Sequence, residues 1–168
     1  MKYTDAKSRF IQSWGVLGSN WGVSRTMAQI HALLLIAPKP MSTEEIMEDL
    51  QISRGNANMN IRSLIEWGLA TKEILPGERK EYFVADKDVR NMAQQIARER
   101  KKRELQPILK VLEQIESVNG EGREVEEFKK VTNGIRGFAS QAESALEMFI
   151  NSKNNWLMKI VGKMRREK

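Results

Sequence analysis

The chain has 168 residues, 40% of them apolar, which is enough for one small domain or a small domain with a helical extension. It has no cysteine, which excludes disulfides and thiolate metal sites, and no apolar run approaches the ~20 residues that cross a bilayer. The net charge of +6 invites a nucleic-acid partner, but residues 1–85 hold ten basic against nine acidic side chains. Nucleic-acid binding therefore has to be inferred from local pattern. No secretory signal is visible, so we expect a cytoplasmic protein with no membrane partner.

Residues 5–20 have the apolar spacing of a helix with one aromatic-rich face. The residues of this face are Phe10, Trp14, Leu17 and Trp21. The glycines at 15, 18 and 22 each cost roughly 1 kcal/mol in a helix relative to alanine, which suggests that another backbone approaches closely or that a small pocket lies here. Two interpretations stay open. The aromatic residues form core or dimer interface, which we favour, or Trp14 and Trp21 hold a small organic effector such as a quaternary ammonium ion.

Residues 24–37 form the next predicted helix, which we expect to pack beneath a helix-turn-helix as its support. His31 on this helix is the only histidine of the chain. Because no second histidine and no cysteine accompany it, we expect His31 to be a structural or a surface residue, with no metal ion and no cofactor.

Residues 42–52 carry the signals of a short helix and a tight turn. Ser42 and Glu45 have the separation of a capping box, in which each side chain bonds the other's backbone N–H. Ile46, Met47 and Leu50 contribute an apolar face, and Ser53 is a second N-cap candidate directly after the turn. This order predicts the first helix and the turn of a helix-turn-helix.

Residues 54–67 predict the second helix of the motif. Its expected buried stripe consists of Ala57, Ile61, Leu64 and Ile65. No Asp or Glu occurs between residues 53 and 65, and arginine and asparagine are the side chains that read guanine and adenine edges in the major groove. Gly55 would let a phosphate approach the helix N-terminus. The expected base contacts are Ser53, Asn56, Asn58, Met59 and Arg62. An ordinary polar helix surface is the less favoured alternative.

A hairpin signal follows this helix. Gly68 ends the helix, and two β-rich runs, 69–75 and 81–85, flank a proline-glycine turn with a charged tip. Such a hairpin directly after such a helix is typical of a DNA-binding wing, although a solvated loop would carry the same charges. Contacts to phosphate or to the minor groove are expected from Arg54, Lys72, Arg79 and Lys80.

Four short motifs carry a family resemblance. They are Trp14-Gly15, Trp21-Gly22, Met27-Ala28-Gln29 and Glu66-Trp67-Gly68-Leu69. Residues 42–86 resemble the winged helix of the MarR family of transcriptional regulators, and residues 10–40 resemble its GbsR-like branch. The second half of the chain is similar only in character, as a charged helical region. The resemblance implies a dimeric, DNA-binding regulator, and members of this branch are associated with sensing small organic solutes such as choline.

Residues 86–118 predict a long helix that Pro107 bends or restarts. Within it, residues 98–104 hold five cations and two anions, which we interpret as a solvated helix surface, with phosphate contact as the alternative. After a break at residues 119–122, a further apolar stripe continues to residue 150, and the two stripes are expected to pair with each other and with a second subunit. The basic tail, residues 156–168, is expected to complete the dimer interface, with membrane-surface binding as the alternative.

These patterns predict a mainly α fold with a small β-hairpin wing, in which a winged helix-turn-helix precedes a long helical dimerisation region. Residues 1–85 would form the DNA-binding domain and residues 86–168 the dimerisation region. The predicted function is a sequence-specific transcriptional regulator, a repressor in preference to an activator, that binds a pseudo-palindromic operator as a homodimer. The alternative is a winged-helix protein-interaction module without DNA readout. An enzyme is not expected, because the sequence contains no nucleophile–base set, metal-ligand pattern or phosphate-binding glycine loop.

Overall fold

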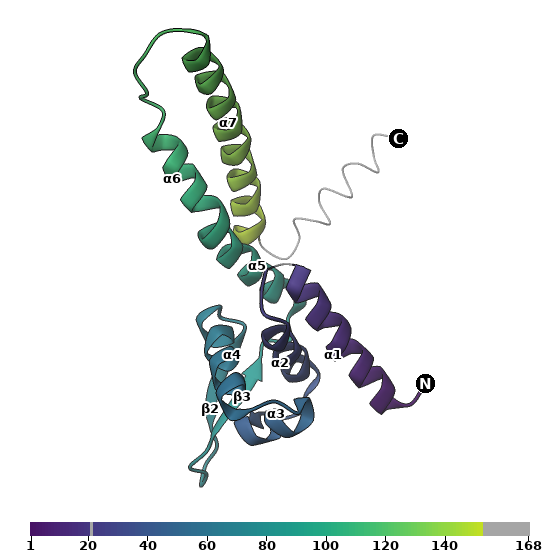
Figure 1. Ribbon diagram of the computed structural model, residues 1–168. Coiled ribbons are helices and arrows are strands. Elements are labelled where there is room, and N and C mark those ends of the chain that lie inside the picture. The colour runs from purple at the N-terminus through teal and green to yellow at the C-terminus, as the bar shows by residue number, and fades with distance from the viewer. Residues whose placement is uncertain (21, 153–168) are drawn as a thin grey trace, which may run out of the picture. The chain divides into compact units, whose positions relative to one another are not determined.

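A computed structural model describes residues 1–20 and 22–152 (Figure 1). Its contacts divide the chain into two units, one from Met1 to Gln95 and one that begins at Ile96. In chain order the elements are α1 (Tyr3–Asn20), α2 (Arg25–Ile36), β1 (Met41–Ser42), α3 (Thr43–Leu50), α4 (Arg54–Glu66), β2 (Ala70–Ile74), β3 (Glu81–Ala85), α5 (Val89–Arg100), the π-helical turn η1 (Lys101–Leu105), α6 (Gln106–Gln114) and α7 (Arg123–Asn151). Helices combined with one small antiparallel sheet form a winged helix-turn-helix, which confirms the predicted fold class.

Two glycines set how closely α1 and α2 pack. A Cβ atom built on Gly18 would lie 2.4 Å from the Cβ of Ala28, a separation that real side chains do not reach. Gly15 is similarly crowded by side chains of α2. The predicted close approach is therefore confirmed at Gly18, where α2 is the partner, whereas a Cβ built on Gly22 would meet nothing within 4 Å among the described residues. The largest fully buried side chains of the core beneath are Ile30, Leu33, Leu34, Ile46 and Leu64.

The predicted caps hold the helix-turn-helix. Ser42 Oγ accepts a hydrogen bond from the Glu45 backbone N–H at 3.3 Å, and Glu45 Oε2 accepts one from the Ser42 N–H at 2.8 Å, which confirms the capping box. Gln51 ends α3 in the left-handed region at a φ of 53°, and Ser53 caps α4. Because the turn is this short, α4 packs against both α3 and α2.

The wing is the antiparallel pair β2 and β3, which extends away from the helices of its unit (Figure 1). Its register places Ala70 opposite Ala85 and Ile74 opposite Glu81. A third strand, β1, pairs with β3, so the sheet order is β1-β3-β2. Strand β1 was not predicted, because a strand of two residues is too short to show an alternating pattern.

Gly68 makes the transition from α4 to the wing. Its φ of +67° lies in the left-handed region, its N–H donates to the carbonyl of Ile65 at 2.9 Å, and the N–H of Leu69 donates to that of Leu64 at 2.9 Å. This pair of bonds is a Schellman motif, which satisfies carbonyls that the end of a helix leaves open. The predicted helix end is confirmed.

The long helix predicted over residues 86–118 forms as three consecutive helical segments, α5, η1 and α6. The π-helical turn η1 separates α5 from α6, and Pro107 is the second residue of α6. Proline has no N–H and its ring would crowd the carbonyl of Arg103 in an uninterrupted α-helix, so the widened turn lies where that clash would occur. Pro107 therefore restarts the helix, as predicted.

Helices α6 and α7 run side by side in opposite directions within this unit (Figure 1). Leu109, Leu112 and Ala139 are buried, which confirms that the two helices cover part of each other's apolar surface. The tail at residues 156–168, for which an interface role was predicted, lies outside the described residues. Over residues 1–20 and 22–152, no helix is both long and apolar enough to cross a bilayer.

Candidate nucleic-acid interface

The buried face of α4 fixes which side chains remain available at the surface. Ala57, Ile61 and Leu64 are at most 2% exposed, as predicted, but Ile65 is 38% exposed, and its inclusion in the buried stripe was wrong. Asn60, only 4% exposed, lies on this face instead. The reason is the helical period, which places residue 60 between residues 57 and 64 and moves residue 65 to the border.

Five residues of this segment were predicted to contact bases. Asn58, Met59 and Arg62 are exposed on the side of α4 opposite the core, with 62% of Met59 exposed. Ser53 is exposed at the helix start, where its hydroxyl accepts a hydrogen bond from the Asn56 N–H at 3.3 Å. Asn56 is half-buried at the edge of the exposed face. The segment thus presents polar and apolar groups that suit base edges, together with a bare helix start at Gly55.

The four cations predicted to contact the DNA backbone differ in their surroundings. Arg54 Nη2 lies 2.7 Å from Glu44 Oε1, and Lys72 forms an ion pair with Glu81 across the wing. Arg79 and Lys80 are exposed in the loop between β2 and β3. Two of the four cations are therefore already occupied by carboxylates of this chain.

Carboxylates on α3 bear directly on anion binding at this surface. A backbone N–H and the Arg54 guanidinium, helped by the charge of Lys80, hold the pKa of Glu44 below its usual range. Glu45 accepts from Lys39 Nζ at 3.2 Å, and Asp49 lies 2.7 Å from Lys7 Nζ. These ion pairs offset much of the negative charge that α3 would otherwise present to a phosphate backbone.

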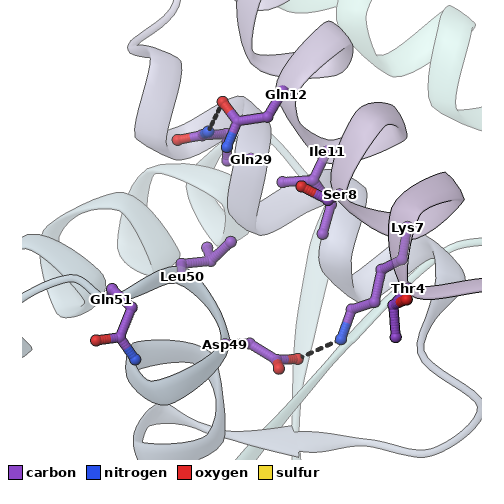
Figure 2. Close-up of a pocket in the computed structure, with 9 residues that line it drawn as sticks. All are labelled: Thr4, Lys7, Ser8, Ile11, Gln12, Gln29, Asp49, Leu50 and Gln51. Atoms are coloured by element: carbon purple, nitrogen blue, oxygen red, sulfur yellow. Dashed lines mark hydrogen bonds and ion pairs between the residues drawn. The ribbon is translucent and has the colours of Figure 1, made fainter.

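A polar groove lies between α1 and the turn that follows α3 (Figure 2). Its volume is about 400 Å³, and amide side chains, among them Gln12, Gln29 and Gln51, make up part of its lining. Figure 2 shows the Lys7–Asp49 ion pair across one end and the hydrogen bond between Gln29 and Gln12 at the other. Its charged and amide groups thus largely satisfy one another. Trp14, predicted to line an effector pocket, is not among the residues of this groove.

Trp14 and His31 form a separate aromatic cluster with Phe10. Trp14 is half-buried, and its ring centroid lies 5.5 Å from that of Phe10 and 6.3 Å from that of His31. Burial lowers the pKa of His31 to about 4, so its imidazole is neutral at physiological pH. Trp21, the other predicted pocket residue, lies outside the described residues. In the part of the chain that the structure describes, no three His, Asp or Glu side chains gather as metal ligands would.

The basic run at residues 98–104 is engaged with carboxylates. Lys101 Nζ lies 3.1 Å from Glu143 Oε1 and also pairs with Glu147, which ties η1 to α7 and raises the pKa of Lys101. Arg100 pairs with Glu104 at 2.8 Å along the helix. The favoured interpretation of this run as a solvated helix surface holds only in part, because Arg98, Lys102 and Arg103 are exposed but Glu99 is buried.

Comparison with solved structures identifies the fold. A crystal structure of a transcriptional regulator superposes with a TM-score of 0.66 over 86% of this chain and 95% of its own, at 19% sequence identity. The transcriptional regulator Tm0710 from Thermotoga maritima gives a TM-score of 0.41 over 89% of this chain and 95% of its own, at 12% identity. No protein-family model and no curated protein matches the chain. The chain therefore has the fold of a solved transcriptional regulator.

Proposed function

We propose that this chain is a sequence-specific, DNA-binding transcriptional regulator of the MarR type, close to the GbsR-like branch. In this proposal α4 is the recognition helix and enters the major groove, while the loop between β2 and β3 is the wing. The observation that carries the proposal is the exposed side of α4, which presents Asn58, Met59 and Arg62 with no carboxylate between residues 53 and 65. DNA repels exposed carboxylates and is read by amide and guanidinium groups.

The contacts divide between the two kinds of DNA group. Base edges are assigned to Ser53, Asn56, Asn58, Met59 and Arg62. The phosphate backbone or the minor groove is assigned to Arg54, Lys72, Arg79 and Lys80. Residues 1–85 serve as the DNA-binding domain, and residues 86–168 as the dimerisation region.

The proposed assembly is a homodimer through α7. Four apolar residues with the 3, 4, 3 spacing of a heptad remain 43–75% exposed on this helix. They are Phe128, Val131, Ile135 and Phe138. A second copy would cover this stripe, and a two-fold dimer would set two recognition helices about one helical turn apart on a pseudo-palindromic operator. Binding there would block transcription, so we propose a repressor that acts in the cytoplasm.

A small organic effector completes the proposal. The half-buried indole of Trp14 offers an aromatic face, and such faces attract quaternary ammonium ions. Titration with choline or glycine betaine should change tryptophan fluorescence and raise the melting temperature. If fluorescence and melting temperature stayed unchanged, choline and glycine betaine would be excluded as effectors, and the DNA-binding proposal would be unaffected.

Selection of binding sites from random DNA by the full chain is the experiment that tests the function. We expect a two-fold related sequence to be enriched, and its affinity to fall steeply as salt rises because bound counterions are released. Failure to enrich any sequence, together with no salt-dependent complex on a gel, would contradict the proposal and favour a protein-interaction module.

A further inference from the structure

A hydrogen-bonded chain connects the start of α2 to the first turns of α4. Ser24 Oγ accepts from the Met27 N–H at 3.0 Å and donates to Asn60 Oδ1 at 2.6 Å. Asn60 Nδ2 then donates to the backbone carbonyl of Asn56 at 2.8 Å and to Asn56 Oδ1 at 2.7 Å. A buried amide with each of its polar atoms engaged in this way is held in one orientation.

Backbone groups at both ends of this series of hydrogen bonds determine which side-chain atoms donate and which accept. The Asn56 carbonyl can only accept, so the Asn60 atom facing it must be the NH₂ group. At the other end the Met27 N–H can only donate, so Ser24 Oγ accepts there and its own proton points to Asn60 Oδ1. An inverted Asn60 amide would set two oxygens 2.8 Å apart. The orientation of Asn60 therefore follows from the backbone.

The same reasoning fixes the amide of Asn56. Its Oδ1 already accepts from the buried Asn60 Nδ2–H, which turns this oxygen toward the core and leaves the Asn56 NH₂ group as the end turned outward. Bidentate recognition of adenine requires the oxygen and the nitrogen of one amide together. An amide whose NH₂ group is turned outward suits guanine, which presents two acceptors, N7 and O6, in the major groove, and it is a poor match for cytosine, which presents a donor.

We infer that Asn60 is a positioning residue that turns the NH₂ group of Asn56 outward and its oxygen inward, which favours guanine over adenine at one operator position. This inference rests on the proposed function, because it concerns how the recognition helix reads a base. Asn60 itself lies on the buried face of α4, so in this proposal it contacts no DNA. It acts by holding the neighbouring amide, and Ser24 anchors it from α2.

Site selection from random DNA with wild-type chain and with Asn56→Ala provides the first test. The substitution should level the base preference at one position of each half-site, and the wild-type preference there should be guanine by roughly 2- to 10-fold, the range for a hydrogen bond gained or lost. A wild-type preference for adenine at that position would overturn the inference. This comparison needs no change in the buried residue.

Asn60→Leu and the double variant Asn56→Ala/Asn60→Leu provide the second test. Asn60→Leu frees the Asn56 amide, so the preference at the same position should move toward adenine while other positions keep theirs. In the double variant the change at residue 60 should have no further effect on the preference. A uniform loss of affinity with an unchanged preference would show that Asn60 is only structural and would overturn the inference. Wild-type chain that selects no DNA at all would overturn the function itself, a distinct outcome.

Discussion

The Arg54 guanidinium lies 2.7 Å from Glu44 Oε1, which ties the first residue of α4 back to α3. If Arg54 contacts phosphate in the complex, it must first leave this carboxylate. Glu44→Gln should therefore strengthen binding to all DNA sequences alike by roughly two- to five-fold, the worth of an exposed ion pair. Fluorescence anisotropy on the selected operator and on unrelated DNA measures both affinities.

Glu48→Gln is the matched control for this change. Glu48 is an exposed carboxylate of the same helix, and no ion pair involves it among the described residues. The substitution removes the same charge without freeing a cation, so its effect should be smaller. Equal gains from the two variants would show that net charge, and not release of Arg54, determines the affinity.

Arg62 and Arg79 should behave differently when replaced by alanine. Arg62 is exposed on α4, so its loss should cost about 1–3 kcal/mol on the operator and relax specificity at one position. Arg79 lies in the wing loop, so its loss should weaken binding on every sequence and lower the salt slope by about 1. Equal losses on operator and unrelated DNA for Arg62→Ala would contradict its assignment to a base.

Local signals were enough to predict the helix-turn-helix, because each depends on residues close in sequence. The Ser42–Glu45 capping box and the Gly68 helix end both form through bonds that span a few residues, so the sequence pattern states them completely. The close packing at Gly18 was also predictable as such, since glycine inside a helix needs a reason. Its partner, Ala28, was not predictable, because that contact belongs to the tertiary structure.

The features that sequence analysis missed depend on distant residues. Asn60 appears in the sequence as one more polar residue beside the stripe, and only its contact with Ser24, 36 residues away, shows why it is buried. The ion pair of Lys101 with Glu143 likewise joins two helices that the periodicity describes separately. Period and composition predict which face of a helix is buried, but not which polar group across the core will satisfy an amide placed there.

Gly18→Ala should destabilise the folded chain. The new Cβ would overlap the Cβ of Ala28 at 2.4 Å, and relieving an overpacked contact of this kind costs about 1–3 kcal/mol. Gly134→Ala is the control, because that glycine lies in α7 with nothing within 4 Å among the described residues. It should stabilise the chain by up to about 1 kcal/mol through helix propensity. Urea denaturation of both variants measures the difference, and a neutral Gly18→Ala would contradict the close packing of α1 on α2.

His31 should make stability depend on pH above the range in which carboxylates titrate. Burial lowers the pKa of His31 from 6.5 to about 4. Between pH 6.5 and about pH 4 the histidine is therefore protonated in the unfolded chain but neutral in the folded chain. The contribution of His31 to the free energy of unfolding is therefore greatest above about pH 6.5, and it decreases as the pH falls from 6.5 toward 4. Between about pH 7.5 and about pH 5.5 the loss should be about 1 kcal/mol. His31→Leu should remove this slope, and an equal slope in the variant would assign it to other groups.

Phe138 is the most exposed apolar residue of the α7 stripe, at 75%, so it is the position at which a charge should disrupt a dimer and leave the protomer folded. Phe138→Glu would place a charge within the stripe, where a heptad interface requires apolar side chains. We expect a monomer by analytical ultracentrifugation, with unchanged helical content.

Met148→Glu is the control, because Met148 is 59% exposed on the same helix but outside the heptad spacing. Monomeric Phe138→Glu should also lose most of its operator affinity, since one half-site alone supplies half of the contacts. If Phe138→Glu remained dimeric, the dimer interface would have to lie on another surface, and the proposed DNA contacts of α4 would be unaffected.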